Sequence, residues 1–236
     1  MTRNCRTASA LGSGKEGRLK KEPRKEPPPG TKQPTSLAVV WVGAIGVLGA
    51  SAIAAIALTR SHSASPNVPT TPPPVVNVTA LPGLAAGPPP WPAEIGHLRT
   101  RLHALGLPAR AGTTLHIHQH VDVFVDGKRV IVPAGIGIGE RFISPLHTHD
   151  ASGVIHVEST TVRSFSLAEF FAVWGVRLTK TCLVDECGNG KLQFFVNGKP
   201  AADPNRVVLT QHQEIAVAFG RLPKPVPSSY RFPSGT

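Results

Sequence analysis

The chain is poor in sulfur and in acidic residues. Its 236 residues include one methionine, Met1, three cysteines, and 14 Asp or Glu against 25 Lys or Arg. With no thioether beyond Met1 and few thiols, the chain lacks the soft ligands that Cu(I) prefers. It also contains no nucleophile motif and no glycine-rich cofactor loop, so no enzyme class follows from a motif.

The excess of positive charge is concentrated at one end of the chain. Residues 1–36 contain nine Lys or Arg and three Glu, whereas the chain from Ser61 onward contains fifteen Lys or Arg and eleven Asp or Glu. Nucleic-acid-binding segments typically have a basic run interleaved with aromatic residues, and this second part has none. The net charge of +11 therefore does not predict a nucleic-acid partner.

A long apolar run follows the basic segment. Leu37–Leu58 has 22 residues without a charge, and a helix of this length, rising about 1.5 Å per residue, spans a bilayer. The sequence predicts a transmembrane helix over residues 37–59 that follows a disordered basic tail over residues 1–36. By the positive-inside rule, the tail is cytoplasmic and the rest of the chain lies outside. Membrane lipid is then a predicted partner.

Two further possibilities concern the same apolar run. A cleaved signal peptide is an alternative, although its apolar core usually has only about 7–15 residues. Gly46, Ala50 and Ala54 form a stripe of small residues, which favours helix pairing in a membrane and hence a homodimer.

The rest of the chain divides by composition. Residues 60–92 are rich in proline and predict an extended linker. Residues 93–222 mix polar and apolar residues, and they are numerous enough to bury a core without a disulfide framework or a structural metal. Residues 223–236 are predicted to form a flexible tail.

Helix signals occur at two places in the domain. An amphipathic helix is expected to begin at Pro92 and to stop at Gly106. A second helix is expected after Ser166, which forms a capping box with Glu169, and it should end at Gly175.

Alternation of apolar and polar residues predicts the strands. Asp126-Gly127 and Asn197-Gly198 are dipeptides favoured in type I′ hairpin turns, so each should join two neighbouring strands. The predicted strands cover residues 115–125, 128–132, 153–159, 192–196 and 214–219.

These elements predict an α+β domain with a mixed β-sheet and one packed helix. Their order resembles the β-grasp arrangement of ubiquitin-like and sulfur-carrier domains, and the segment from Val196 to Gly220 is similar to the end of those carriers. Those carriers end in a free Gly-Gly tail, whereas this chain continues beyond Gly220, so the resemblance does not imply carrier chemistry. A small β-barrel is the alternative fold.

Histidines are concentrated in the strand region. Alternate residues of a strand share a face, so the three histidines of HIHQH point the same way as Asp122, and His156 shares a face with Glu158. A single strand histidine is usually an ordinary half-buried residue. Six histidines that alternate with β-branched core residues instead predict a metal site. The candidate ligands are His116, His118, His120, His147, His149 and His156.

Imidazole and carboxylate ligands suit Zn(II), Cu(II), Ni(II) or Fe(II), with zinc as the first choice and copper as the second. Asp122, Asp150 and Glu158 are either direct ligands or acceptors for the imidazole N–H groups, and both roles remain open.

The segments HIHQHVDVFVDGK, ISPLHTHDASGVIHVES and FSLAEFFAVWGV together resemble an uncharacterised family of membrane-anchored or secreted histidine-rich domains of actinobacteria and related lineages. The resemblance covers nearly the whole outer domain and implies an extracytoplasmic location, but no established activity. Outside the membrane, a disulfide between Cys182 and Cys187 is expected, and two thiolate ligands are the alternative.

Three functions follow as hypotheses. The first is a tethered module that captures or buffers a divalent transition metal. The second is an enzyme in which a metal held by three histidines activates water, with Asp150 or Glu158 as the general base. The third is an interaction domain whose histidines sense pH.

Overall fold

A computed structural model describes residues 68–73, 75, 77–188 and 191–236. Within these ranges the fold is α+β, and a mixed seven-stranded sheet runs in the order β10-β9-β11-β1-β6-β5, with β2 also paired to β1. This described sheet does not close into a barrel, so the β-barrel alternative is wrong.

The predicted transmembrane helix over residues 37–59 lies outside the described residues, as does the basic tail. Among the residues that are described, no helix has both the length and the apolar character needed to cross a membrane.

The centre of the sheet is β1, which spans Leu115–Val125, as predicted. One edge of β1 pairs in parallel with β11 (Glu214–Phe219). Its other edge is shared by two antiparallel partners, β6 (Val154–Ser159) along the first half and β2 (Lys128–Val130) along the second. The chain therefore has to return to β1 three times, which brings distant segments together.

The sheet extends on both sides of this centre. β9 (Leu192–Val196) lies beside β11 and carries β10 (Lys199–Ala201) at its far edge. On the opposite side, β5 (Leu146–His147) pairs with β6. Short strands of two residues, β5 among them, have no alternating pattern long enough to be recognised in the sequence.

Both predicted hairpin turns are confirmed by their backbone angles. Asp126 and Gly127 have φ values of 49° and 76°, and Asn197 and Gly198 have values of 50° and 74°. A type I′ turn requires positive φ at both central residues, which Asn, Asp and Gly tolerate best.

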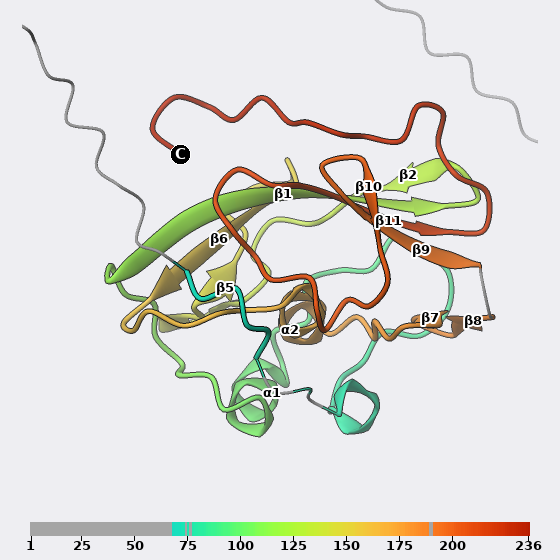
Figure 1. Ribbon diagram of the computed structural model, residues 1–236. Helices are drawn as coiled ribbons and strands as arrows, with labels where there is room; N and C mark the ends of the chain where they lie inside the picture. The colour runs from blue at the N-terminus through green and yellow to red at the C-terminus, as the bar shows by residue number, and fades with distance from the viewer. Residues whose placement is uncertain (1–67, 74, 76, 189–190) are drawn as a thin grey trace, which may run out of the picture. The chain divides into compact units, whose positions relative to one another are not determined.

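The helix α2 (Leu167–Trp174) packs under the sheet, as Figure 1 shows. Ser166 and Glu169 form the predicted capping box, and Gly175 ends the helix in the left-handed conformation at φ 87°. Every residue of α2 is buried. The capping residues set the two ends of α2, and the burial of all its residues fixes the helix against the sheet.

The first helix is shorter than predicted. α1 spans Leu98–Ala104 and packs on α2, whereas the segment that follows Pro92 is not helical and Ile95 is 53% exposed. In that segment the Glu94 backbone N–H donates to the Trp174 carbonyl at the end of α2, and the Glu94 side chain accepts from the His97 N–H. These contacts hold the segment against α2 in place of a first helical turn. The domain thus has a second packed helix within the described residues, where the fold prediction counted one.

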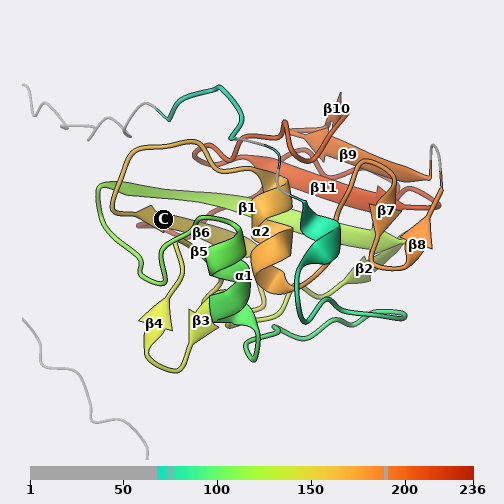
Figure 2. The same ribbon diagram turned by 90° about the horizontal axis from the view of Figure 1, so that it is seen from below.

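Smaller elements complete the domain, and Figure 2 shows them around the helices. The pairs β3 (Ile138–Gly139) with β4 (Phe142–Ile143), and β7 (Cys182–Leu183) with β8 (Glu186–Cys187), form separate hairpins, and the expected disulfide joins Cys182 to Cys187. A single 3₁₀ turn at Val78–Ala80 is described before α1.

Part of the proline-rich segment also belongs to this core. Val78, Leu81 and Trp91 lie within the predicted linker over residues 60–92, and all three are buried in the main hydrophobic cluster. Trp91 contacts Trp174 of α2 edge to face, with the ring centroids 6.2 Å apart.

The two faces of β1 have different surroundings. Ile117, Val121 and Val123 belong to the main core that contains α2. Phe124 points to the other face, where it packs with residues of β9 and β11 and with Leu222 and Val226 of the C-terminal segment. This segment, predicted to be a flexible tail over residues 223–236, runs along the face of the sheet opposite α2 in Figure 1.

Candidate functional site

Strand register aligns three histidines across three neighbouring strands. His118 of β1 lies directly opposite His156 of β6, and His156 lies directly opposite His147 of β5. One step along, His116 is opposite Glu158. Because directly opposite residues project from the same face, these side chains meet on the face that points away from α2.

The alternation within each segment adds a second histidine to each end of this row. His116 Nε2 lies 3.2 Å from His118 Nε2, and His147 Nε2 lies 3.2 Å from His149 Nε2. Two nitrogens at about 2.0–2.1 Å from a tetrahedral zinc ion are separated by about 3.3–3.4 Å. Each pair is therefore spaced as two ligands of one ion.

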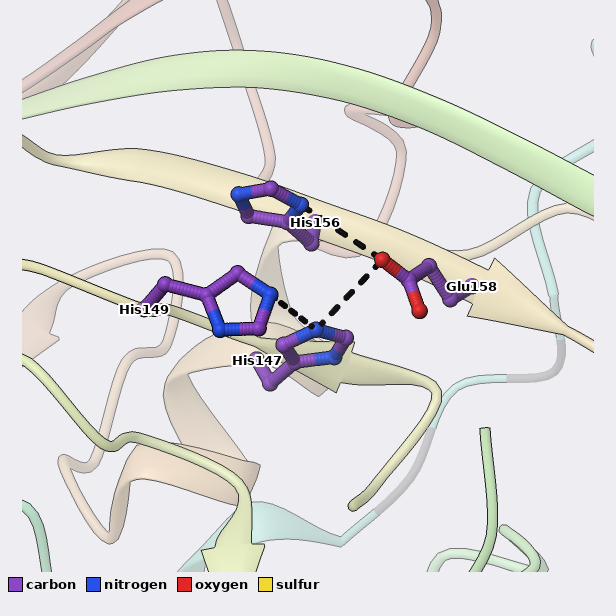
Figure 3. A group of neighbouring side chains, drawn as sticks. All are labelled: His147, His149, His156 and Glu158. Atoms are coloured by element: carbon purple, nitrogen blue, oxygen red, sulfur yellow. Dashed lines mark hydrogen bonds and ion pairs between the residues drawn. The ribbon is translucent and has the colours of Figure 1, made fainter. Parts of the chain in front are cut away.

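Glu158 lies among the histidines of all three strands. Its Oε1 is 3.4 Å from His116 Nε2, 3.7 Å from His147 Nε2 and 3.6 Å from His156 Nδ1. Figure 3 shows how the Glu158 carboxylate and three of the imidazole rings converge. We call this set the histidine cluster, and its members are His116, His118, His147, His149, His156 and Glu158.

Burial keeps the inner members of the cluster neutral. It lowers the pKa of His118, His147 and His156 to about 4 in each case, and neighbouring histidines add to the effect by disfavouring a second positive charge. His116 and His149 are exposed at the edges of the cluster. Only the neutral form of imidazole binds a metal, so the inner ligands are prepared for binding at neutral pH.

A hydrogen bond to the backbone orients the imidazole ring of His147. His147 Nδ1 lies 2.9 Å from the Ser144 carbonyl oxygen and donates to it, which leaves the lone pair on Nε2, the atom that faces His149. Such a hydrogen bond from the far nitrogen is a common feature of metal-bound histidine. In contrast, the Nδ1 atoms of His118 and His156 are buried without a hydrogen-bond partner.

His120 belongs to a different arrangement. Its Nδ1 lies 2.7 Å from Glu214 Oε2, its Nε2 lies 2.9 Å from the Ser152 carbonyl oxygen, and Tyr230 stacks on the ring. Burial raises the pKa of Glu214, and the hydrogen bond to His120 opposes this. His120, Asp122 and Glu214 also lie close enough together to hold an ion. However, both ring nitrogens of His120 are already engaged.

Gly153 makes the close approach behind His120 possible. Its φ is +93°, and a Cβ at this position would lie 2.6 Å from the Val121 carbonyl oxygen and 2.9 Å from His120 Nε2. A side chain at this position would therefore clash with the backbone of β1 and with the His120 ring.

The remaining predicted residues have other contacts. Asp122 accepts a hydrogen bond from Arg129 at 2.6 Å, and Asp150 accepts one from the Ser152 backbone N–H. The side chain of Ser152, together with its backbone N–H, holds the pKa of Asp150 below its usual value. Asp150 is exposed next to the cluster. Cys182 and Cys187 are joined to each other, so the alternative of two thiolate ligands is wrong for this oxidised form.

Sequence reasoning missed the partners that come from distant segments. Glu214 and Tyr230 were not recognised, because each contacts His120 only through tertiary structure. Ser144 was also missed, although it lies only three residues before His147, because its contact is made by the backbone carbonyl and not by its side chain. A carboxylate at the first position of the last strand was the one available signal for Glu214.

The chain was compared with protein-family models, with curated proteins and with solved structures, and nothing matches it.

Proposed function

We propose that this protein is a membrane-anchored extracytoplasmic module that binds a divalent transition metal through the histidine cluster, in order to capture or buffer the metal. The single observation that supports it most is the register of β1, β6 and β5, which places His118, His156 and His147 side by side. Each end of this row adds an H-x-H partner at ligand spacing.

The chemistry of the donors favours zinc, with copper as the second choice. All donors of the cluster are imidazole nitrogens or carboxylate oxygens, and none is a thiolate or a thioether. These donors suit divalent zinc or copper and disfavour Cu(I). The exposed positions of His116 and His149 give an ion a route to and from solvent.

The proposed location follows from the sequence. A transmembrane helix over residues 37–59 would tether the domain on the outer side of the membrane, and pairing of two such helices would make a dimer. The resemblance to anchored or secreted histidine-rich domains, and the disulfide between Cys182 and Cys187, support an oxidising extracytoplasmic compartment.

We also propose that the domain is β-grasp-like. Support comes from the strand order, in which the parallel pair β1 and β11 lies between β2 and β9, and from α2, which follows the β1–β2 hairpin along the chain. β5 and β6 would then be additions that carry half of the histidine cluster.

Metal analysis of the full-length protein tests the proposed function. The detergent-purified chain is stripped with a chelator and incubated with zinc or, in a parallel sample, with Cu(II). Free metal is removed by gel filtration, and bound metal is measured by mass spectrometry of the elements. We expect zinc in at least equimolar amount, and a loss of at least about tenfold in affinity when His118 and His149 are both replaced by Ala. The matched control is His103→Ala, because His103 is exposed on α1 and outside the cluster. Absence of stoichiometric zinc and copper from the unmodified protein would refute the proposal.

A further inference from the structure

The histidine cluster offers more ligands than one ion can use. A protein-bound zinc ion usually takes four ligands, whereas six residues converge here. In the described part of the chain, the potential ligands around His156 fall into two groups, one with His116 and His118 and the other with His147, His149 and Glu158. Both groups contain His156.

We infer that the cluster binds two divalent transition-metal ions side by side, one on the pair His116 and His118 and the other on the pair His147 and His149, with Glu158 shared between them. This inference rests on the proposed function and specifies its stoichiometry. It assigns the same chemical class, zinc or divalent copper, to both ions.

The first ion is assigned to β1. The Nε2 atoms of His116 and His118 are 3.2 Å apart, and the two ring centroids are 4.7 Å apart. Alternate residues on a flat strand project in parallel, about 6.6–7 Å apart, so the two rings lean toward each other. This convergence gives one ion two nitrogen ligands.

The second ion is assigned to the end of β5. His147 and His149 converge in the same way, with 3.2 Å between their Nε2 atoms and 4.8 Å between their ring centroids. His147 is fully buried, and the Ser144 carbonyl fixes its proton on Nδ1. The lone pair of Nε2 is therefore directed at the position between the two rings (Figure 3).

Glu158 connects the two positions. Its Oε1 approaches His116, a ligand of the first ion, and His147, a ligand of the second, to within 3.4 Å and 3.7 Å. A carboxylate has two oxygens and several lone pairs, and it can bind two ions at once. Paired ions in two-metal sites are typically about 3.5–4 Å apart.

His156 lies at the centre of the cluster. Its ring contacts those of His118 and His149 edge to face, with centroid distances of 4.5 Å and 4.4 Å. Its Nδ1 is buried, has no hydrogen-bond partner, and lies 3.6 Å from Glu158 Oε1. A buried nitrogen without a partner is unfavourable, and the second ion would satisfy it, because His156 and Glu158 belong to the same group of potential ligands as His147 and His149.

The number of ions per chain tests this inference. The full-length protein is loaded with Cu(II) and passed through a gel-filtration column. The copper content per chain and the electron paramagnetic resonance spectrum are then measured. We expect two ions per chain and the half-field signal of two coupled Cu(II) ions. His116→Ala and His149→Ala each remove one exposed ligand, from the first and from the second position, so neither variant disturbs the buried core. Each is expected to retain one ion and to lose the half-field signal, whereas His103→Ala keeps both.

The possible outcomes separate this inference from the proposed function. One ion per chain in the unmodified protein, with the same loss of affinity in both variants, would overturn the two-ion assignment and leave metal binding in place. Two ions without magnetic coupling would also overturn it, since the shared Glu158 requires neighbouring ions. No bound copper and no bound zinc would overturn the proposed function itself.

Discussion

Acidification should destabilise the metal-free domain through three histidines. His118, His147 and His156 have pKa values of about 4 in the folded state because of burial, compared with 6.5 for a free side chain. Between these two values the unfolded state binds more protons than the folded state. The free energy of unfolding is therefore unaffected by these groups above pH 6.5 and falls as the pH decreases toward 4.

The expected size of the effect follows from the pKa difference. At pH 5 each independent histidine reduces the free energy of unfolding by about 2 kcal/mol, and the three together reduce it by several kcal/mol. Small domains have total stabilities of about 5–15 kcal/mol, so the metal-free protein should lose a large part of its stability over this range. Zinc should move the transition to lower pH, because it binds the neutral rings in competition with protons.

Urea denaturation of the chelator-treated full-length protein measures this dependence, with tryptophan fluorescence as the signal, since Trp174 is fully buried. His156→Gln should reduce the slope of stability against pH by about a third, because one of three groups no longer titrates. His103→Ala, on the exposed side of α1, should leave the slope unchanged. Equal stability of the metal-free protein at pH 7 and pH 5 would refute the reasoning, as would an unaltered slope in His156→Gln.

Two further predictions concern residues outside the cluster. Glu214→Ala leaves His120 buried without its 2.7 Å partner, so it should cost about 1–3 kcal/mol in urea denaturation at pH 7; unchanged stability would contradict the role of this pair. Ser166→Ala removes the capping box of α2 and should lower the free energy of unfolding by about 1 kcal/mol in the same assay, while the metal content stays constant. A loss of metal in this variant would contradict the separation of helix and site.

Much of the fold could be predicted from local signals in the sequence. β1, β9 and β11 have the predicted bounds, both hairpin turns contain the dipeptides that tolerate positive φ, and α2 begins and ends at its predicted cap residues. These features depend on residues that are close together in the chain. α1 was predicted too long because Glu94 contacts the end of α2, which is distant in the sequence.

The candidate site shows the same division. The sequence alone determined that His116 and His118 share a face, as do His156 and Glu158, because alternation within a strand is a local property. Only the tertiary structure decided which strands lie next to each other. The register of β6 between β1 and β5 brings the two groups of histidines together, and the parallel pairing of β1 with β11 separates His120 from them by placing Glu214 beside it. Strand pairing is set by burial of one face of the sheet and by the lengths of the connections, which no short stretch of sequence records.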